Sequence, residues 1–161
     1  MGILSRIAAA LGLAATVAAC DVGIHDLKPG ESSAEQVLKV MGAPSYEWRE
    51  ADGTLVWEFA QWRAGLVTYM AEIGADGVLK ALRQVLAEEY FAQVKNGMAQ
   101  AEVRRLLGQP GARMTFPARS EEVWTWRYGP VMPEGIDEFN AHFDLAGRVV
   151  STSRSRTAQP Q

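Results

Sequence analysis

The chain has 161 residues and a formal net charge of −3 at pH 7, with 48% hydrophobic and 22% charged residues. This length fits one ordinary domain or two very small ones, and the composition is that of a globular protein. An acidic balance lacks the basic surface that duplex DNA or RNA requires, so the composition argues against nucleic-acid binding.

The N-terminal segment is typical of an export signal. Residues 1–19 contain Arg6 followed by an apolar run that is too short to span a bilayer stably. The run ends in Val-Ala-Ala-Cys, whose cysteine, Cys20, is the single cysteine of the chain. This ending resembles the bacterial lipobox, which implies cleavage before Cys20 and attachment of diacylglycerol and an N-acyl chain to it. A chance cysteine in an export signal is the alternative.

The first expected helix lies in "PGESSAEQVLKVMGAP" (29–44). Its apolar residues recur at helical spacing and form one stripe, namely Ala34, Val37, Leu38 and Met41. Ser32 and Glu35 have the spacing of a capping box. Gly42 suits a left-handed residue that closes a helix, and Pro44 prevents the helix from continuing.

Two hairpins are expected after this helix. "SYEWRE" and "TLVWEFA" flank a Gly-containing turn at 51–53, and "LVTYMAEI" and "VLKALRQVL" flank another at 74–77. These hairpins predict an antiparallel sheet.

The helix segment then recurs. "LAEEYFAQV" (86–94) predicts a short connecting helix, and "NGMAQAEVRRLLGQP" (96–110) predicts a second amphipathic helix. The apolar stripe of this helix consists of Ala99, Val103 and Leu106, and the helix is expected to end at Gly108 and Pro110. Its expected cap residue is Ala99, which has no side-chain acceptor for an early amide.

Three further strands are expected in the second half. "EEVWTWRY" is followed by a Gly- and Pro-rich loop at 129–135, then by "DEFNAHFDL" and "RVVSTSR", which Gly147 joins in a turn. Phe139, Ala141 and Phe143 alternate with polar residues, so one face of this sheet is expected to be dry. The tail after Arg154 is expected to be unstructured.

The two halves show the same landmarks in the same order. "VWEF" (56–59) corresponds to "VWTW" (123–126), and Gly77 corresponds to Gly147. We interpret this as a tandem duplication and expect an α+β fold, each unit packing one or two helices on a three- to four-stranded antiparallel sheet. The expected boundaries are a signal peptide at 1–19, a lipidated tether at 20–28, repeat 1 at 29–86, repeat 2 at 87–154 and a flexible tail at 155–161.

A lipobox followed by a helix ending in Gly-x-Pro and a strand with Trp-x-aromatic resembles the BamE (SmpA/OmlA) lipoprotein family. The matching residues of the second half are Gly97, Met98, Glu102, Val103, Leu106, Leu107, Gly108, Pro110, Trp124 and Trp126. The first half matches less well, through Gly30, Val37, Gly42, Pro44, Trp57 and Phe59. The resemblance covers most of residues 27–153. It implies a non-enzymatic, lipid-anchored adaptor or scaffold on the periplasmic face of the outer membrane, acting in β-barrel protein assembly or envelope maintenance. The β-barrel assembly machinery is then the expected protein partner in the first of these roles.

Two features depart from that family. BamE looks like a single unit, whereas a tandem of such units is also similar to the β-lactamase inhibitory proteins, which grip an enzyme with a concave double sheet. A tethered protein-binding inhibitor is therefore the alternative function. Asp21 follows Cys20 directly; in enteric bacteria this residue signals retention in the inner membrane, so inner-membrane placement stays open.

The sequence shows no pattern that is typical of an enzyme. The chain has only two histidines, His25 and His142, and no free cysteine near them, so a metal site is not expected. It contains neither a Gly-x-Ser-x-Gly nucleophile elbow nor a phosphate-binding glycine loop. We therefore expect a non-enzymatic protein with no cofactor apart from the acyl chains on Cys20.

The strand aromatics have two interpretations. They either form the core beneath the helices or form an exposed strip that anchors a protein partner. The candidate partner-binding residues are Trp57, Phe59, Trp62, Trp124, Trp126 and Tyr128.

Overall fold

The computed structural model of the protein describes residues 23–60 and 66–158. The first half contains a 3-10 turn η1 (Ile24–Asp26), a helix α1 (Ala34–Met41) and strands β1 (Tyr46–Arg49), β2 (Leu55–Phe59), β3 (Tyr69–Ile73) and β4 (Leu79–Gln84). The second half contains helices α2 (Glu88–Phe91) and α3 (Gln100–Leu107), strand β5 (Ala112–Phe116), a 3-10 turn η3 (Pro117–Arg119) and strands β6 (Glu121–Met132), β7 (Gly135–Phe143) and β8 (Val149–Thr157).

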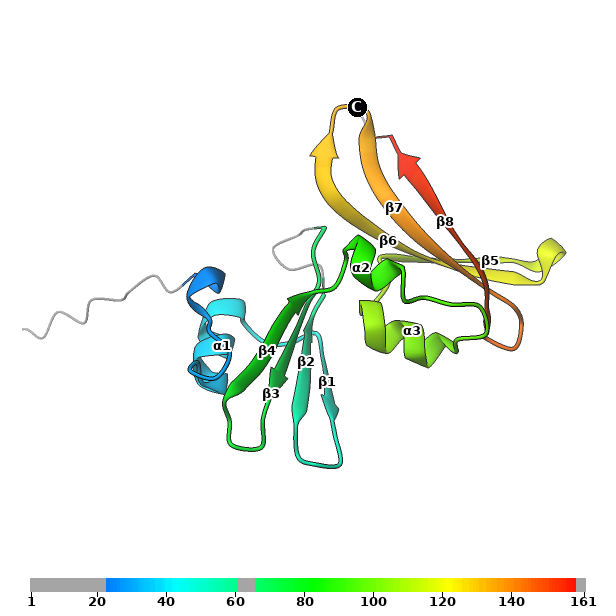
Figure 1. Cartoon of the computed structure of the whole chain (residues 1–161). Helices are drawn as coiled ribbons and strands as arrows, with labels where there is room; N and C mark the ends of the chain where they lie inside the picture. Colours follow the sequence, from blue (N-terminus) through cyan, green and yellow to red (C-terminus); the bar gives the residue numbers. More distant parts are fainter. Residues whose placement is uncertain (1–22, 61–65, 159–161) are drawn as a thin grey trace, which may run out of the picture.

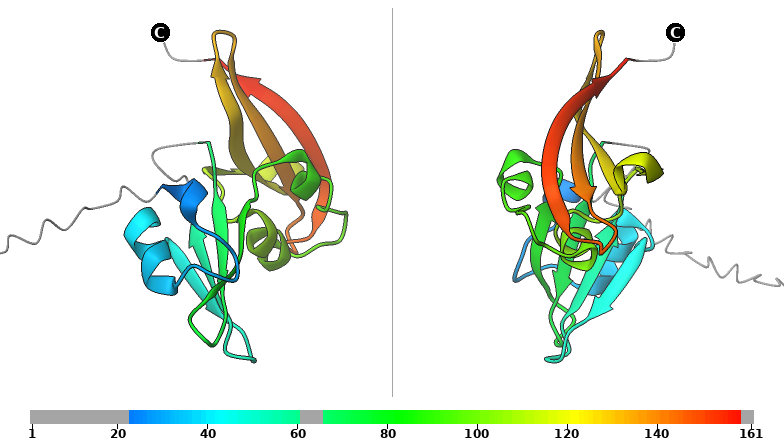
Figure 2. Two further views of the ribbon diagram at one scale, coloured as in Figure 1. Left: turned by 60° about the vertical axis from the view of Figure 1, so that its left-hand side comes forward. Right: turned by 90° about the vertical axis from the view of Figure 1, so that its right-hand side faces the viewer.

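The strands form two four-stranded antiparallel sheets, with strand orders β1-β2-β3-β4 and β5-β6-β7-β8. Helix α1 covers the outer face of the first sheet, while α2 and α3 lie between the two sheets (Figures 1 and 2). The predicted α+β class is confirmed. Each half runs from a helix into four strands; a common origin of the halves by duplication stays a prediction. None of the helices in the described ranges is long and apolar enough to cross a membrane.

Helix α1 begins one residue later than the sequence predicted. Ser33 is the N-cap: its hydroxyl accepts from the backbone N–H of Gln36 (3.2 Å), and the Gln36 side chain accepts from the Ser33 N–H (2.7 Å). The predicted capping box of Ser32 and Glu35 is therefore wrong. The Ser32 hydroxyl instead accepts from the backbone of Lys28 (2.9 Å) and lies buried.

The first hydrophobic core lies between α1 and the first sheet. Its buried residues are Leu27, Val37, Met41, Trp57, Phe59, Ala71, Ile73 and Leu79. Leu38, which the predicted stripe included, is 38% exposed and does not belong to this core. Leu27 belongs to this core although it falls in the predicted tether, so the end of that segment packs on the fold.

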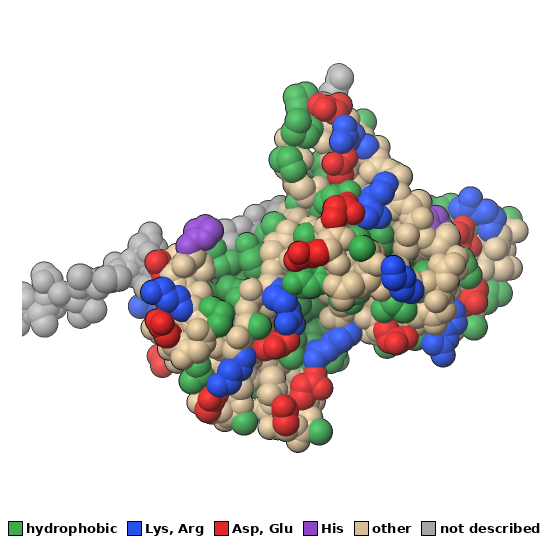
Figure 3. All heavy atoms as spheres, in the orientation of Figure 1, with side chains coloured by type: hydrophobic (Ala, Val, Ile, Leu, Met, Phe, Trp, Pro, Cys, Tyr) green, Lys and Arg blue, Asp and Glu red, His purple; other side chains and the backbone are tan. Residues whose placement is uncertain are grey.

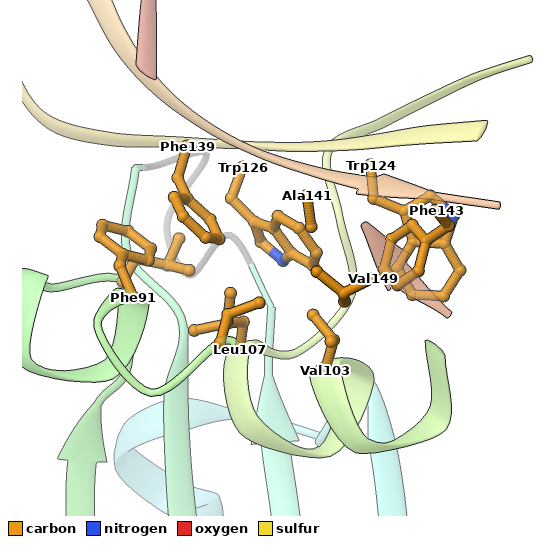
Figure 4. Packing of buried hydrophobic residues seen from close by; sticks show 11 residues of the cluster. Phe91, Val103, Leu107, Trp124, Trp126, Phe139, Ala141, Phe143 and Val149 are labelled. Carbon is orange, nitrogen blue, oxygen red and sulfur yellow. The ribbon is translucent and has the colours of Figure 1, made fainter. Parts of the chain in front are cut away.

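The second core lies between α3 and the second sheet (Figure 4). Phe139, Ala141 and Phe143 of β7 are fully buried, so the predicted dry face is confirmed. From α3, Val103 and Leu107 point into this core. The helical stripe thus uses Leu107 where Leu106 was expected.

The second sheet is longer than the sequence predicted. Residues 129–135 do not form a loop, because β6 runs to Met132 and pairs with β7 again at Gly135 after an irregularity in register. Strand β8 continues to Thr157, beyond the predicted start of the tail. Strand β5 had no counterpart among the expected elements.

Gly42 and Gly108 end their helices with backbone angles that only glycine adopts readily. Their φ angles are 82° and 80°, with ψ angles of −163° and −170°. The predicted positive φ is confirmed for both glycines. Their ψ angles, however, are those of an extended backbone and not those of the left-handed helical conformation. This region of conformational space is essentially restricted to glycine.

Candidate functional site

The first sheet carries apolar side chains on both faces. On the face away from α1, Val56, Met70 and Val85 form a separate buried cluster, against which Tyr90 packs from α2. A sheet with two apolar faces needs a cover on each side. The second half of the chain supplies the second cover through α2 and α3.

This cover leaves a groove of about 490 Å³ between the first sheet and the α2–α3 segment. The residues that line it are Val56, Met70, Glu72, Arg83, Val85, Tyr90, Gln93, Met98, Glu102, Arg105 and Leu106. Its volume lies in the range of pockets that hold small molecules or side chains of a partner. We refer to it as the inter-sheet groove.

The floor of the inter-sheet groove is apolar and its rim is charged with both signs. Glu72 and Arg83 form an ion pair across β3 and β4, with side chains 31% and 42% exposed. Glu102 of α3 accepts from the backbone N–H of Ala99 (2.7 Å). Acidic and basic side chains alternate along the boundary between the first sheet and α2–α3 (Figure 3). The rim therefore favours no single charge sign.

A buried carboxylate fixes α3 against the first sheet. The Glu58 side chain on β2 has no exposed area; it accepts from the backbone N–H of Gln109 (2.7 Å) and forms an ion pair with Arg104. On the other side of the helix end, the Trp126 indole donates to the carbonyl of Gly108 (3.1 Å). The end of α3 is thus bonded to both sheets, and this sets the spacing across the groove.

Two arginines of α3 also stack on the aromatics of β1. The guanidinium carbons of Arg104 and Arg105 lie 5.2 and 4.7 Å from the ring centroid of Trp48. Tyr46, half of whose surface is exposed, lies 4.7 Å from Trp48. Cation–π contacts of this kind hold the outer edge of the interface between α3 and β1.

A second charged contact links α2 to strand β8 of the second sheet. Arg154 donates to Glu88 (2.8 Å), and this hydrogen bond lowers the pKa of the Glu88 carboxyl below its ordinary value. The Tyr128 hydroxyl donates to the same carboxylate (3.3 Å), while burial raises the pKa of Tyr128.

The predicted partner-binding aromatics lie in the two cores. Trp57, Phe59, Trp124 and Trp126 are at most 6% exposed, and Tyr128 packs partly buried against the second core. The core interpretation is confirmed for these residues, which form no exposed strip. Two predicted residues, Cys20 and Trp62, lie outside the described residues.

The two histidines lie far apart in the fold. His25 is exposed in η1, and His142 lies on the face of the second sheet that points away from α3. Within residues 23–60 and 66–158, no group of three or more His, Cys, Asp or Glu side chains is placed to hold a metal ion.

The inter-sheet groove was not predicted from the sequence. The signal was present in "LVWEF", where Val56 is apolar although it alternates with the core residues Leu55 and Trp57. Apolar side chains on both faces of one strand indicate a sheet that is covered twice. The position of the second cover depends on α3, which is remote in sequence.

Comparison with known proteins finds no matching family model and no matching curated protein. Two solved structures are similar in part. One is a DUF4309 family protein (YjgB) from Bacillus subtilis, with 14% identity over 81% of this chain and 82% of that chain, and a TM-score of 0.33. The other is from Streptococcus mutans and carries the provisional name beta-lactamase inhibitor protein. It has 14% identity over 77% of this chain and 82% of that chain, and a TM-score of 0.31. Scores at this level do not establish a shared fold.

The assignment to the BamE (SmpA/OmlA) family is wrong. No family model matches the chain, and the two similar structures are of other proteins. The residues that carried the resemblance have structural roles: Val103 and Trp126 are core residues, and Gly108 ends a helix. The role in outer-membrane β-barrel assembly that the resemblance implied is therefore not supported either.

Proposed function

We propose that this chain is a protein-binding module and that the inter-sheet groove receives an apolar side chain of its partner. The observation that supports the proposal is the pairing of an apolar floor, formed by Val56, Met70 and Val85, with a rim of balanced charge. Protein interfaces combine a desolvated apolar anchor with a polar, solvent-accessible rim in the same way. Inhibition of the bound partner is the more specific form of this proposal.

We propose further that acyl chains on Cys20 tether the module to a membrane on its periplasmic side. The Val-Ala-Ala-Cys sequence supports this. Two or three buried acyl chains, at about 0.8 kcal/mol per CH2, hold a small domain on a bilayer stably. The outer membrane is the proposed location and the inner membrane is the alternative that Asp21 raises. Metabolic labelling with an alkyne fatty acid, lost in Cys20→Ala, and membrane fractionation test the anchor and its location.

Site-specific photocrosslinking tests the groove. The photoreactive residue benzoylphenylalanine is placed at Gln93, on the exposed rim, and in a matched variant at Lys39, exposed on α1 at the opposite side of the first sheet. We expect a crosslink to one defined envelope protein from position 93 and none from position 39. Leu106→Trp, which puts a larger side chain into the groove, should weaken the crosslink from position 93. Equal crosslinking at both positions, or none at position 93, would contradict the proposal.

The inhibitory function needs a separate measurement. The crosslinked partner is identified by mass spectrometry, purified and assayed with and without a molar excess of this protein. Loss of partner activity, restored by Leu106→Trp, is the expected result. If the activity of the partner is unchanged, the inhibitory function is contradicted and only the binding function stands.

A further inference from the structure

Three side chains form a continuous hydrogen-bonded row across the second sheet. They come from adjacent strands: Glu121 from β6, His142 from β7 and Ser153 from β8. Nδ1 of His142 lies 2.6 Å from Oε1 of Glu121, and Nε2 lies 2.8 Å from Oγ of Ser153. The row lies on the face that points away from α3, because the neighbouring residues Ala141 and Phe143 face the core.

The partners determine the tautomer of the imidazole. An ionised carboxylate only accepts hydrogen bonds, so Nδ1 of His142 carries the proton and donates to Glu121. Nε2 of the neutral ring is then a lone-pair acceptor, and the Ser153 hydroxyl donates to it. This is the arrangement in which an imidazole acts as a general base on a serine hydroxyl.

The surroundings hold the base in place and leave the hydroxyl accessible. The second carboxylate oxygen of Glu121 binds Nε of Arg119 at 3.0 Å, so both oxygens are engaged. The side chains of Glu121 and His142 are only 17% and 20% exposed. Ser153, in contrast, is exposed on β8, which is the last strand in the order of its sheet.

We propose that Ser153 is an activated nucleophile that reacts with carboxylic esters, an activity beyond the proposed binding function. Oγ attacks the ester carbonyl carbon and its proton passes to Nε2 of His142. The C–O bond to the leaving alcohol breaks, and the alcohol takes that proton. Water then attacks the acyl-serine, again giving its proton to Nε2; the bond between the acyl group and Oγ breaks, and Oγ regains the proton. Glu121 orients the ring and stabilises its protonated form.

The same face of the sheet provides a matched internal control. Ser155, two residues further along β8, is also exposed and also hydrogen-bonded. Its hydroxyl accepts from Nδ2 of Asn140 (2.9 Å) and donates to Glu138 (2.9 Å). If the row were a structural hydrogen-bond ladder only, Ser153 and Ser155 would react at comparable rates.

The experiment treats the purified full-length chain with a fluorophosphonate and measures phosphonylation of each serine by peptide mass spectrometry. General-base assistance contributes about 10²–10⁴-fold, so we expect Ser153 to react at least about 100-fold faster than Ser155. His142→Gln should reduce the Ser153 rate to that of Ser155, and Glu121→Gln should reduce it less. With p-nitrophenyl acetate, a burst of one nitrophenol per chain should vanish in Ser153→Ala and persist in Ser155→Ala.

Either of two results would overturn the proposal. One is labelling of Ser153 no faster than that of Ser155 in the unsubstituted chain, a comparison that needs no variant. The other is a rate at Ser153 that His142→Gln leaves unchanged while circular dichroism shows the variant folded.

Discussion

The carboxylate of Glu58, in the first sheet, forms an ion pair with the guanidinium of Arg104, on a helix of the second half. The two residues are 46 positions apart in the chain. The Glu58 side chain has no exposed area and that of Arg104 is 18% exposed, so water has little access to the pair. The two halves of the chain are therefore joined by a desolvated charge pair as well as by apolar contact.

Removing the Glu58 carboxylate should destabilise the whole chain. Because Glu58→Ala leaves Arg104 and the Gln109 N–H without their buried acceptor, we expect a loss of about 3 kcal/mol or more in the free energy of unfolding. Urea denaturation measures it. The control Glu72→Ala removes a pair whose partners are 31% and 42% exposed, and should cost at most about 1 kcal/mol. Equal losses in the two variants would show that the Glu58 pair does not hold the halves together.

Substitutions of Gly42 and Gly108, the two glycines that end helices, distinguish the cost of backbone strain from the cost of close packing. Both have a positive φ that costs about 1–3 kcal/mol for another residue, so both Gly42→Ala and Gly108→Ala should destabilise. A Cβ at Gly108 would also lie 2.8 Å from Cγ2 of Thr68 and 3.0 Å from Oε1 of Glu58, whereas one at Gly42 meets no atom within 4 Å. Gly108→Ala should therefore cost at least about 1 kcal/mol more. Equal melting temperatures for the two variants would argue against close packing at Gly108.

Completing the cap of α3 should stabilise the protein. Ala99 occupies the N-cap position and makes no side-chain cap bond, although Glu102 already accepts from its backbone N–H. Ala99→Ser would add a hydroxyl acceptor of the kind that Ser33 supplies to α1, worth about 1 kcal/mol. Ser33→Ala should lose a similar amount. An unchanged melting temperature in Ala99→Ser would mean that another group already satisfies the first amides.

The contact of Glu88 with Arg154 should make stability depend on pH. The hydrogen bond from Arg154 lowers the pKa of Glu88, so the folded chain favours the ionised carboxylate. The stabilisation is fully present above the ordinary value of 4.5 and is lost as the pH falls through the lowered pKa of the folded state. Since Glu88 is 69% exposed, the effect should stay below about 1 kcal/mol.

Urea denaturation of Glu88→Gln at pH 7 and at pH 3 measures this effect. The variant should be less stable than the unsubstituted chain at pH 7, and the difference between the two should be smaller at pH 3. Glu89→Gln is the control, because Glu89 forms no ion pair with the described residues; at pH 7 it should be less destabilising than Glu88→Gln. If Glu88→Gln lowers the free energy of unfolding more at pH 3 than at pH 7, the stabilising contact of Glu88 with Arg154 is contradicted.

Local sequence patterns predicted the elements that local interactions determine. The helix around Val37 and the alternation of Phe139, Ala141 and Phe143 follow from side-chain periodicity, and both agree with the structure. The predicted break at 129–135 failed for a related reason. Gly129 and Pro130 usually mark a loop, but pairing between β6 and β7 resumes at Met132 and Gly135 and carries the hairpin past them.

The groove and the serine row depend on contacts between distant segments. Val56 meets α2 and α3 only after the chain has completed two more strands, and no local pattern fixes that packing. Similarly, Glu121, His142 and Ser153 lie diagonally across three strands, so the register of each pair decides whether they meet. A shift of one residue would move each side chain to the other face of the sheet.

Because α3 packs on both sheets, the order of synthesis affects folding. Strands β2, β3 and β4 are complete before α3 exists, so the cluster of Val56, Met70 and Val85 is covered from that side only by Tyr90 until the chain has reached Leu107. During this interval the first sheet presents an apolar face to other chains, which is a common route to aggregation. A fragment that ends before α3 should therefore be recovered mostly in inclusion bodies. Separate expression of the two halves would leave one sheet without α3 whichever half kept it, because Val103 and Leu107 of the same helix fill the second core.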